Sequence, residues 1–565
     1  MPTGVLRPQT NTFRTVLDLS GLWEFRLDPD DVGKTEGWLD GIPGGRLIAV
    51  PGSWNEQLAG ARDVLGPAWY ETSFELPRTW PGRTFVRFGS ADYLAEVFLN
   101  GERLGDHEGG QLPFAFELGT NLRPGPNRLV VRVDRRLFPD RVPPGGLPPS
   151  AETGWRRDFN PQTSFDFFPY AGLQRAVQIC GVPEGGIDRI SVATALAERG
   201  AIVSVRVEHG GGALRLRLGN VVSDGEDLRL TEARLWSPAD PHLESLVVEL
   251  ERAGEVVDRY VLPIGMRSVE VEGDRLLLNG EPIRLRGFGR HEDFPVSGRG
   301  VPSAVAVSDL ELLRWTGANS FRTAHYPHAE EALDLADRYG LLVIAETPAV
   351  GLFFHEPGLE RRRQTALCLL EELIERDRNR PSVIAWSVAN EPASAQPGAD
   401  NALRELLERA RSLDPGRPAT FASDTPDDPA LEHCDVIALN RYFGWYTLPG
   451  RIEEAATRLA ADLDAVHQRH RKPIILTEIG ADAIPGAHAD PAEMWSEEYQ
   501  AELLDELLRV AEERPFVCGA HVWTLCDFKT GQAKHRPAGL NYKGVFTRDR
   551  RPKLAARQLR KRWNR

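Results

Sequence analysis

The chain has 565 residues, of which 41% are hydrophobic and 27% charged, a composition typical of folded globular proteins rather than disordered chains. Its length exceeds what a single hydrophobic core supports, so we expect roughly two to four domains. The net charge of −14 disfavours a surface for nucleic acid or anionic membranes, although a local cationic pocket for a small anion stays compatible with it.

The sequence also predicts a cellular location. It begins without a basic segment followed by an apolar one, and no apolar run reaches the ~18 residues of a membrane span. Its five cysteines form no Cys-x-x-Cys pair, and we interpret them as buried free thiols in a reducing compartment. A cytoplasmic protein follows.

Short strands separated by turns fill residues 12–183, as in "LWEFRL", "WYETSFEL" and "NRLVVRV". The dipeptide Asn100-Gly101 between two alternating runs is typical of a β-hairpin. We predict a jelly-roll sandwich over residues 1–183. Residues 140–162, which are rich in proline, glycine and polar side chains, are expected to form a long loop. Further short strands predict a small immunoglobulin-like sandwich over 184–270.

Apolar runs alternate with amphipathic helical patterns over residues 271–565. Eight such units in this length predict a catalytic (β/α)8 TIM barrel, so the fold class is multidomain, β plus α/β. The predicted strands are 283–291, 319–327, 341–347, 383–391, 419–424, 435–442, 473–478 and 519–528.

Two of these strands carry a glutamate out of the apolar run. "SVIAWSVANEPAS" ends at Asn390, Glu391 and Pro392, and "KPIILTEIG" presents Glu478 before a glycine. Barrel enzymes place their chemistry at the carboxyl ends of the strands, so these carboxylates are expected to face each other across one mouth. Paired carboxylates, one protonated and one ionised, are the groups that hydrolyse glycosides.

Plainer interpretations exist for each residue alone. A single glutamate at a strand end is more often an ion-pair partner or lies next to a helix cap, but two on strands four and seven favour catalysis. "GRHED" suggests a metal, yet His291 lacks a second ligand at helical spacing. We therefore expect a hydrogen-bonding histidine at the rim, and the same for His325.

The chain resembles the β-glucuronidases of glycoside hydrolase family 2 over nearly its whole length. The motifs that carry the resemblance are "DFFPYAGLQR", "GFGRHED", "NSFRTAHYPHAEE", "SVIAWSVANEP", "LNRYFGWY", "LTEIG", "MWSEEYQ" and "NYKGVFTRDRRPK". The last is the most specific, because the family's Asn-x-Lys element, matched by Asn541 and Lys543, binds the carboxylate of the sugar. The resemblance implies that Glu391 is the acid/base and Glu478 the nucleophile of a retaining hydrolase.

It further implies that Asn390 binds the sugar 2-hydroxyl and that Tyr442 orients the nucleophile. The remaining expected substrate-binding residues are Asp166, which would reach in from the jelly roll, His325, Asn440, Tyr446 and Trp523. Arg536 lies near the family's arginine before Asn-x-Lys, but its spacing is shifted by one residue, so its role stays open. A second departure is the short segment 348–358 after strand three, where bacterial relatives often carry a long loop.

The expected reaction is hydrolysis of β-D-glucuronides, as small conjugates or oligosaccharides, to glucuronic acid and an alcohol, with no cofactor and no metal. A neutral sugar is expected to leave Lys543 desolvated and unpaired, a mismatch that can reject an analogue by about 10⁴–10⁵-fold. The alternatives are a β-galacturonidase or dual uronidase and, less well supported, a β-galactosidase or a non-catalytic glycan-binding protein. Similar enzymes commonly form dimers or tetramers, so a homo-oligomer is expected. The natural aglycone stays open.

Overall fold

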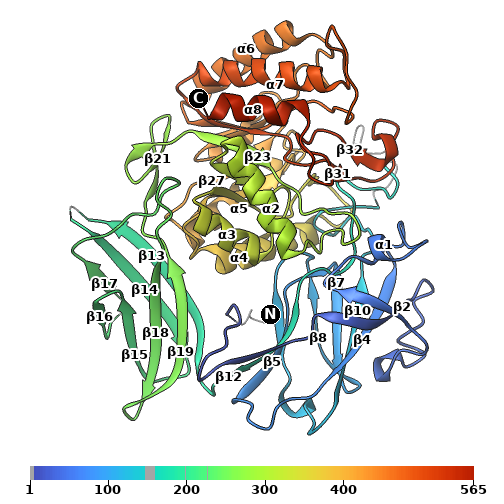
Figure 1. The fold of residues 1–565 in the computed structure, drawn as a ribbon, viewed down its shortest axis with the longest axis vertical. Helices are drawn as coiled ribbons and strands as arrows, with labels where there is room; N and C mark the ends of the chain where they lie inside the picture. The colour runs from blue at the N-terminus through green and yellow to red at the C-terminus, as the bar shows by residue number, and fades with distance from the viewer. Residues whose placement is uncertain (1–5, 147–158, 198, 226, 565) are drawn as a thin grey trace.

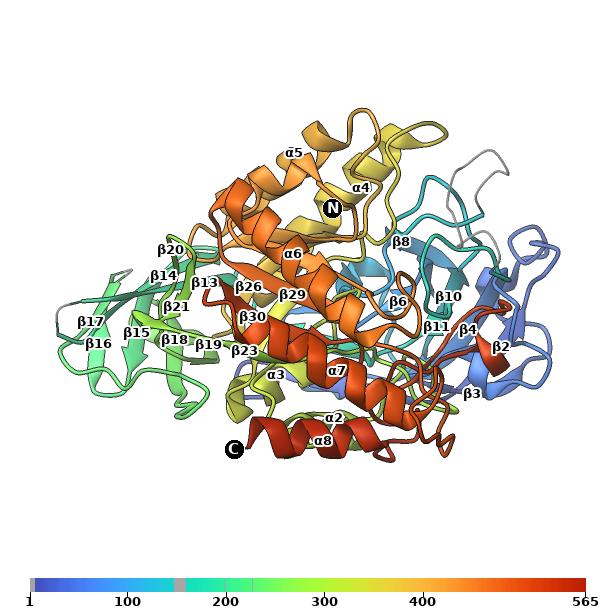
Figure 2. The ribbon, with the colours of Figure 1, turned by 90° about the horizontal axis from the view of Figure 1, so that it is seen from above.

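The computed structural model describes residues 6–146, 159–197, 199–225 and 227–564. Three units follow one another along the chain: a blue β-sandwich, a green β-sandwich and a yellow-to-red barrel above them (Figure 1). Seen from above, the two sandwiches lie on opposite sides of the barrel (Figure 2). The predicted multidomain fold is confirmed. The domain boundaries 1–183, 184–270 and 271–565 stay predictions.

The first unit packs two antiparallel sheets around one core. Residues alternate between core and surface, as in β2, where Trp23 and Phe25 are buried while Leu22 is exposed. The predicted hairpin at Asn100-Gly101 is confirmed, because both residues have positive φ and join β7 to β8. One sheet contains β1 (Thr15–Asp18), β12 (Val177–Val182), β5 (Arg83–Phe88) and β9 (Phe114–Glu117). The other contains β3 (Arg46–Val50), β2 (Gly21–Leu27), β4 (Pro67–Phe74), β10 (Asn127–Asp134), β7 (Leu94–Leu99) and β8 (Glu102–Glu108).

Short elements complete this unit. They are α1 (Trp54–Gln57), the two-stranded pair β6 (Ala91–Asp92) and β11 (Gly172–Leu173), and the 3-10 turns η1 (Trp38–Asp40) and η2 (Gly119–Asn121). The predicted loop 140–162 lies partly outside the described residues, since residues 147–158 are not described.

The second unit is a smaller sandwich with its own apolar core, as predicted for an immunoglobulin-like fold. One sheet contains β13 (Ile187–Leu196), β14 (Ala201–His209) and β17 (Asp227–Leu230). The other contains β16 (Val221–Ser223), β15 (Ala213–Leu218), β18 (Glu244–Arg252) and β19 (Glu255–Ile264).

The third unit is a closed barrel of eight parallel strands, and all eight predicted strands are present. The strands are β23 (Leu285–Gly289), β24 (Ser320–Arg322), β25 (Leu342–Glu346), β26 (Val383–Asn390), β27 (Ala419–Ser423), β28 (Ile437–Asn440), β29 (Ile474–Ile479) and β30 (Val517–Val522). The helices are α2 (Ser303–Thr316), α3 (Glu330–Tyr339), α4 (Leu359–Asp377), α5 (Ala399–Leu413), α6 (Ile452–His470), α7 (Glu497–Glu512) and α8 (Leu554–Trp563). After β27 the 3-10 turn η4 (Pro429–His433) takes the place of a longer helix.

The two ends of the barrel differ. A small meander closes the amino-terminal end, where Leu276 and Leu278 pack against Leu285, Leu342 and other strand-start residues in one cluster. The meander consists of β20 (Val269–Glu272), β21 (Arg275–Leu278) and β22 (Glu281–Pro282). Because this end is plugged with apolar side chains, the polar strand tips at the opposite end are left to form a site.

The first sandwich reaches the open end of the barrel. Asn160 exchanges backbone hydrogen bonds of 2.8 and 2.9 Å with Gln532, and the amide of Phe168 donates to the carbonyl of Lys529 at 2.9 Å. The barrel segment that receives these bonds contains β31 (Phe528–Lys529), η5 (Pro537–Gly539) and β32 (Leu540–Asn541). Residues 159–174 of the sandwich are therefore fixed beside the barrel mouth.

Two predictions about the chemistry of the whole chain can be compared with the structure. All five cysteines are free thiols; four are buried as predicted, whereas Cys368 is only partly buried. Among the residues that the structure describes, no helix combines the length and apolar character needed to cross a membrane.

Candidate active site

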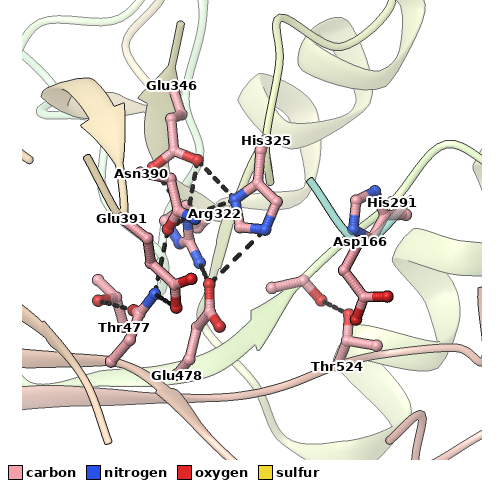
Figure 3. Close-up of polar contacts among 12 residues, drawn as sticks. Asp166, His291, Arg322, His325, Glu346, Asn390, Glu391, Thr477, Glu478 and Thr524 are labelled. Carbon is pink, nitrogen blue, oxygen red and sulfur yellow. Dashed lines mark hydrogen bonds and ion pairs between the residues drawn. The ribbon is translucent and has the colours of Figure 1, made fainter. Parts of the chain in front are cut away.

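Side chains from seven of the eight barrel strands or the loops after them meet at the open end. Glu391 follows β26 and Glu478 lies in β29, and Figure 3 shows both carboxylates turned toward the same space. The pairing register of β26, β28 and β29 becomes irregular close to these tips. Such irregularities are common at functional strand ends, because they redirect side chains out of the regular ladder.

The backbone at Glu391 adopts an unusual conformation. Its φ of +43° lies in the left-handed region, which costs a non-glycine residue about 1–3 kcal/mol. Pro392 follows directly, and its ring disfavours the helical alternative for the residue before it. The strained turn is held because the Glu391 amide donates to the Ala422 carbonyl at 2.8 Å. The chain thus fixes the direction in which this carboxylate leaves the barrel.

Glu391 also has a fixed partner in the neighbouring strand. Asn440 Nδ2 donates to Glu391 Oε1 at 2.9 Å and to Asn390 Oδ1 at 3.1 Å. Thr477 Oγ1 donates to Asn440 Oδ1 at 2.8 Å, which sets the orientation of the Asn440 amide. The expected residues Asn390, Glu391 and Asn440 are therefore brought together.

Glu478 is surrounded by donors. Arg322 Nη2 donates to its Oε1, Tyr442 OH donates to its Oε2, and His325 Nε2 lies 3.7 Å from Oε1. Arg322 is fully buried, and its Nη1 donates to both oxygens of Glu346 at 2.7 and 2.8 Å. One guanidinium therefore connects two buried carboxylates, and Glu478 receives charge-assisted hydrogen bonds suited to an anion.

The two catalytic candidates are electrostatically coupled. Burial and, after it, the neighbouring Glu391 raise the pKa of Glu478 to about 8, against the opposing effects of Arg322 and Tyr442. A pair of this kind binds one proton near neutral pH, and the proton belongs to the pair rather than to one member. The guanidinium and the phenol that donate to Glu478 act against the effect of burial and favour its ionised form.

A cleft with a volume of about 910 Å³ opens over this pair. Most of the expected substrate-binding residues line it, and the Trp523 ring stacks on His325 with centroids 4.7 Å apart. Phe165 and Asp166 enter its wall from the first sandwich, as expected for Asp166. The expected residues that line the cleft are Asp166, His325, Asn390, Glu391, Asn440, Tyr442, Tyr446, Glu478, Trp523 and Asn541.

Lys543 and Arg536 lie behind one side of the cleft. Lys543 Nζ donates to Tyr446 OH at 3.0 Å and to Asp482 Oδ2, and Lys543 is 1% exposed. Arg536 Nη2 donates to the same Tyr446 OH at 2.9 Å. The structure thus corrects one expectation: a neutral sugar would not leave Lys543 unpaired, because Asp482 already neutralises it.

Arg536, whose spacing before Asn541 and Lys543 is shifted by one residue, pairs with Asp166. Its Nε donates to Asp166 Oδ1 at 2.9 Å, its Nη2 donates to Asp166 Oδ2, and Asn541 Nδ2 donates to that same Oδ2 at 2.8 Å. The arginine therefore contacts two residues of the cleft wall, Asp166 and Tyr446, despite the shifted spacing. Asp166 is its partner across the boundary between the first sandwich and the barrel.

Three family models match this chain. The barrel model, "Glycosyl hydrolases family 2, TIM barrel domain", matches residues 269–565, and the family's "sugar binding domain" matches residues 16–183. A third model, "Glycosyl hydrolases family 2", matches residues 202–267. The chain belongs to family 2 of the glycosyl hydrolases.

Similar proteins align with this chain over nearly its whole length. A protein named beta-glucuronidase from Paenibacillus borealis is 40% identical over 99% of this chain and 98% of its own. The beta-glucuronidase of Mus musculus is 38% identical over 99% of this chain and 92% of its own. The crystal structure of Ruminococcus gnavus beta-glucuronidase superimposes with a TM-score of 0.94 at 37% identity, covering 100% of both chains.

Sequence reasoning missed three residues of this family 2 site. Arg322 lies inside the strand-two run "NSFRTAHYP", and Glu346 ends the strand-three run "LLVIAET". Glu346 occupies the same kind of strand tip that drew attention to Glu391 and Glu478, so the same rule could have found it. Asp482 follows Glu478 by four residues in a loop, and no local pattern indicates its pairing with Lys543.

The histidines and possible metal ligands have other roles. His291 Nδ1 hydrogen bonds to Tyr326 OH at 3.1 Å, which confirms the expected hydrogen-bonding histidine. Among the described residues, Asp400, Glu432 and His433 place possible ligand atoms within 4.8 Å of one another. Glu432 is exposed, and His433 is already hydrogen bonded to Asp400 at 2.9 Å, so this cluster is an ordinary surface ion-pair group.

Proposed function

We propose that the protein is a retaining exo-β-glucuronidase that releases glucuronic acid from β-D-glucuronides. The observation that carries the proposal is the pair of glutamates at the barrel mouth, with a second buried cluster of Lys543, Arg536 and Asn541 beside the same cleft. Full-length relatives named beta-glucuronidase support it, as do neighbours solved with D-glucaro-d-lactam and uronic deoxynojirimycin.

In the first step, Glu478 attacks the anomeric carbon of the bound sugar. A bond forms between a Glu478 oxygen and this carbon while the bond to the leaving oxygen breaks, and Glu391 gives its proton to that oxygen. Arg322 and Tyr442 hold Glu478 in place and keep its charge available for the attack. The alcohol leaves, and a covalent glycosyl-enzyme remains.

In the second step, water hydrolyses the glycosyl-enzyme. Glu391, now ionised, accepts a proton from the water as the water oxygen attacks the anomeric carbon, and Glu478 leaves as a carboxylate. Both groups return to their starting protonation states. No cofactor and no metal takes part in this scheme.

The sugar carboxylate is assigned to the corner formed by Asn541, Lys543 and Arg536. An ammonium and an amide can donate to the two oxygens of one carboxylate, and each charge-assisted hydrogen bond contributes roughly 1.5–3 kcal/mol. Because Asp482 neutralises Lys543 in the free enzyme, the preference for a uronide comes from these gained bonds. It does not come from an unpaired lysine in the glucoside complex.

A panel of nitrophenyl β-glycosides tests the proposal. Glucuronide, galacturonide, glucoside and galactoside are compared by kcat/KM at one pH, and the glucuronide is expected to be cleaved best. Comparable cleavage of the galacturonide would instead support a uronidase of dual specificity, since the two sugars differ at one hydroxyl. Absence of turnover on all four, with uronate binding retained, would support a non-catalytic glycan-binding protein.

Two further features belong to the proposal: the cellular location and the oligomeric state. Five free thiols support a cytoplasmic location, since a reducing compartment keeps cysteines unpaired. The family resemblance supports a homo-oligomer, a dimer or a tetramer, which light scattering on the purified protein would measure directly.

A further inference from the structure

A buried carboxylate lies in the corner that is proposed to bind a carboxylate. Asp482 is 0% exposed, and its Oδ2 accepts from Lys543 Nζ while lying 3.7 Å from Arg536 Nη1. Its Oδ1 accepts from the backbone amide of Tyr542 at 2.8 Å. The negative charge of Asp482 repels the carboxylate of the substrate. A role other than direct substrate binding must therefore explain why an aspartate lies in this corner.

Asp482 connects two loops that carry residues of the proposed site. It follows the nucleophile Glu478 by four residues, and Tyr542, whose amide it accepts, lies between Asn541 and Lys543. Asp482 therefore ties the loop of the nucleophile strand to the loop of the proposed uronate-binding residues. Burial acts to raise the pKa of Asp482, but Lys543 and Arg536 lower it below its ordinary value, so Asp482 stays ionised.

We propose that Asp482 is a positioning residue that keeps Lys543 protonated and directed at the uronate corner in the substrate-free enzyme. This inference rests on the proposed glucuronidase function and assigns the origin of its selectivity. Without a nearby anion, a buried ammonium loses its proton more readily, because burial disfavours the charged form. A neutral Lys543 would no longer give a charge-assisted bond to the substrate carboxylate.

The charged and titratable groups around Lys543 come from several elements of the barrel and from the first sandwich. Asp482 is the buried anion that contacts the Lys543 ammonium, and the Arg536 guanidinium lies 3.7 Å from the same carboxylate oxygen. Tyr446 accepts from the same ammonium, and the Tyr442, Trp445 and Tyr446 rings lie 4.7–5.7 Å from it. The groups farther out are Asp166, which is bonded to Arg536 and Asn541, and the pair Asp527–Lys553.

The test is the pH dependence of selectivity in Asp482→Asn. The ratio of kcat/KM for nitrophenyl glucuronide to that for nitrophenyl glucoside is measured from pH 5.5 to 9.5. Both substrates need the same glutamate pair, so titration of the pair cancels in this ratio. The wild-type ratio is expected to be independent of pH, whereas the Asp482→Asn ratio should fall with rising pH, by up to about tenfold per unit once Lys543 deprotonates.

A matched control is Asp527→Asn, which removes another buried aspartate that is paired with a lysine, Lys553, at 2.7 Å. Its ratio is expected to stay independent of pH, even if the protein becomes less stable. Asp482→Glu, which restores the charge, should return the ratio toward the wild-type profile. A flat ratio in Asp482→Asn, or the same slope in Asp527→Asn, would overturn the proposal.

If Asp482→Asn fails to fold, the double variant Asp482→Asn/Lys543→Gln can be used to test the proposal instead. The double variant removes both charges of the buried pair, so it leaves no unpaired charge in the interior. Its ratio is expected to be low and flat, and a ratio as high as the wild type would overturn the proposal. Failure of the proposed function has a separate signature: the wild-type enzyme itself would not prefer the glucuronide at any pH.

Discussion

Replacing Glu391 by glutamine separates its two tasks as proton donor and as neighbour of Glu478. Glutamine keeps a side-chain oxygen that can accept from Asn440 Nδ2, so the 2.9 Å contact and the strained turn need not change. What is lost is the proton. A general acid contributes about 10²–10⁴-fold, but only where the leaving group needs protonation.

We therefore expect kcat/KM for a poorly activated alkyl glucuronide to fall about 10²–10⁴-fold, and that for a dinitrophenyl glucuronide to change little. The pH dependence of cleavage provides a second test of the assignment of Glu391 as the acid. The pKa of Glu478, raised by burial and by Glu391 to about 8, means that the pair loses its proton as pH rises through about 8. Wild-type cleavage of the alkyl glucuronide should decline there. In Glu391→Gln the repulsion is gone, so cleavage of the activated substrate should show no such decline.

Stopped assays of both substrates over pH 5–9.5 check these points, with thermal unfolding as the control for folding. Azide should also rescue Glu391→Ala and yield a β-glucuronyl azide, since the small anion can attack the glycosyl-enzyme without a general base. Equal losses on the alkyl and the dinitrophenyl substrates would refute the assignment of Glu391 as the acid.

Three further outcomes are expected. Glu478→Gln should nearly abolish turnover of both substrates, because no other side chain replaces the nucleophile; retained activity on the dinitrophenyl substrate would contradict this. Lys543→Ala should lower kcat/KM for the glucuronide by about 10–140-fold, the equivalent of one charge-assisted bond of 1.5–3 kcal/mol, and affect the glucoside less; an unchanged glucuronide-to-glucoside ratio would show that the carboxylate binds elsewhere. The short segment 348–358 should leave room for a glucuronate-capped oligosaccharide, so its kcat/KM should approach that of nitrophenyl glucuronide, and complete failure on it would mean that another segment closes the cleft.

The barrel and the glutamate pair could be predicted because both depend on local patterns. Apolar β-branched runs that end in polar residues mark the strands, and the barrel fold brings all their carboxyl ends to one face. Arg322 escaped notice because an arginine within a short apolar run has no distinctive signal, and its partners Glu346 and Glu478 lie 24 and 156 residues away. The pairing of Lys543 with Asp482 depends likewise on two loops that only the folded barrel brings together, so the sequence alone predicted an unpaired lysine.

The pair between Asp166 and Arg536 joins residues 370 positions apart, one from the first sandwich and one from the barrel. The sandwich has a core of its own, but Leu112 and Val142 also pack into the barrel core, and Phe165 and Phe167 share an apolar cluster with barrel residues. Separation of the two units would have to break this shared packing as well as the ion pair. Such undocking would remove Phe165 and Asp166 from the wall of the cleft and release Arg536. Loss of turnover in mild denaturant therefore measures the stability of the interface between the first sandwich and the barrel. This loss should occur at a lower denaturant concentration than the loss of helical circular dichroism.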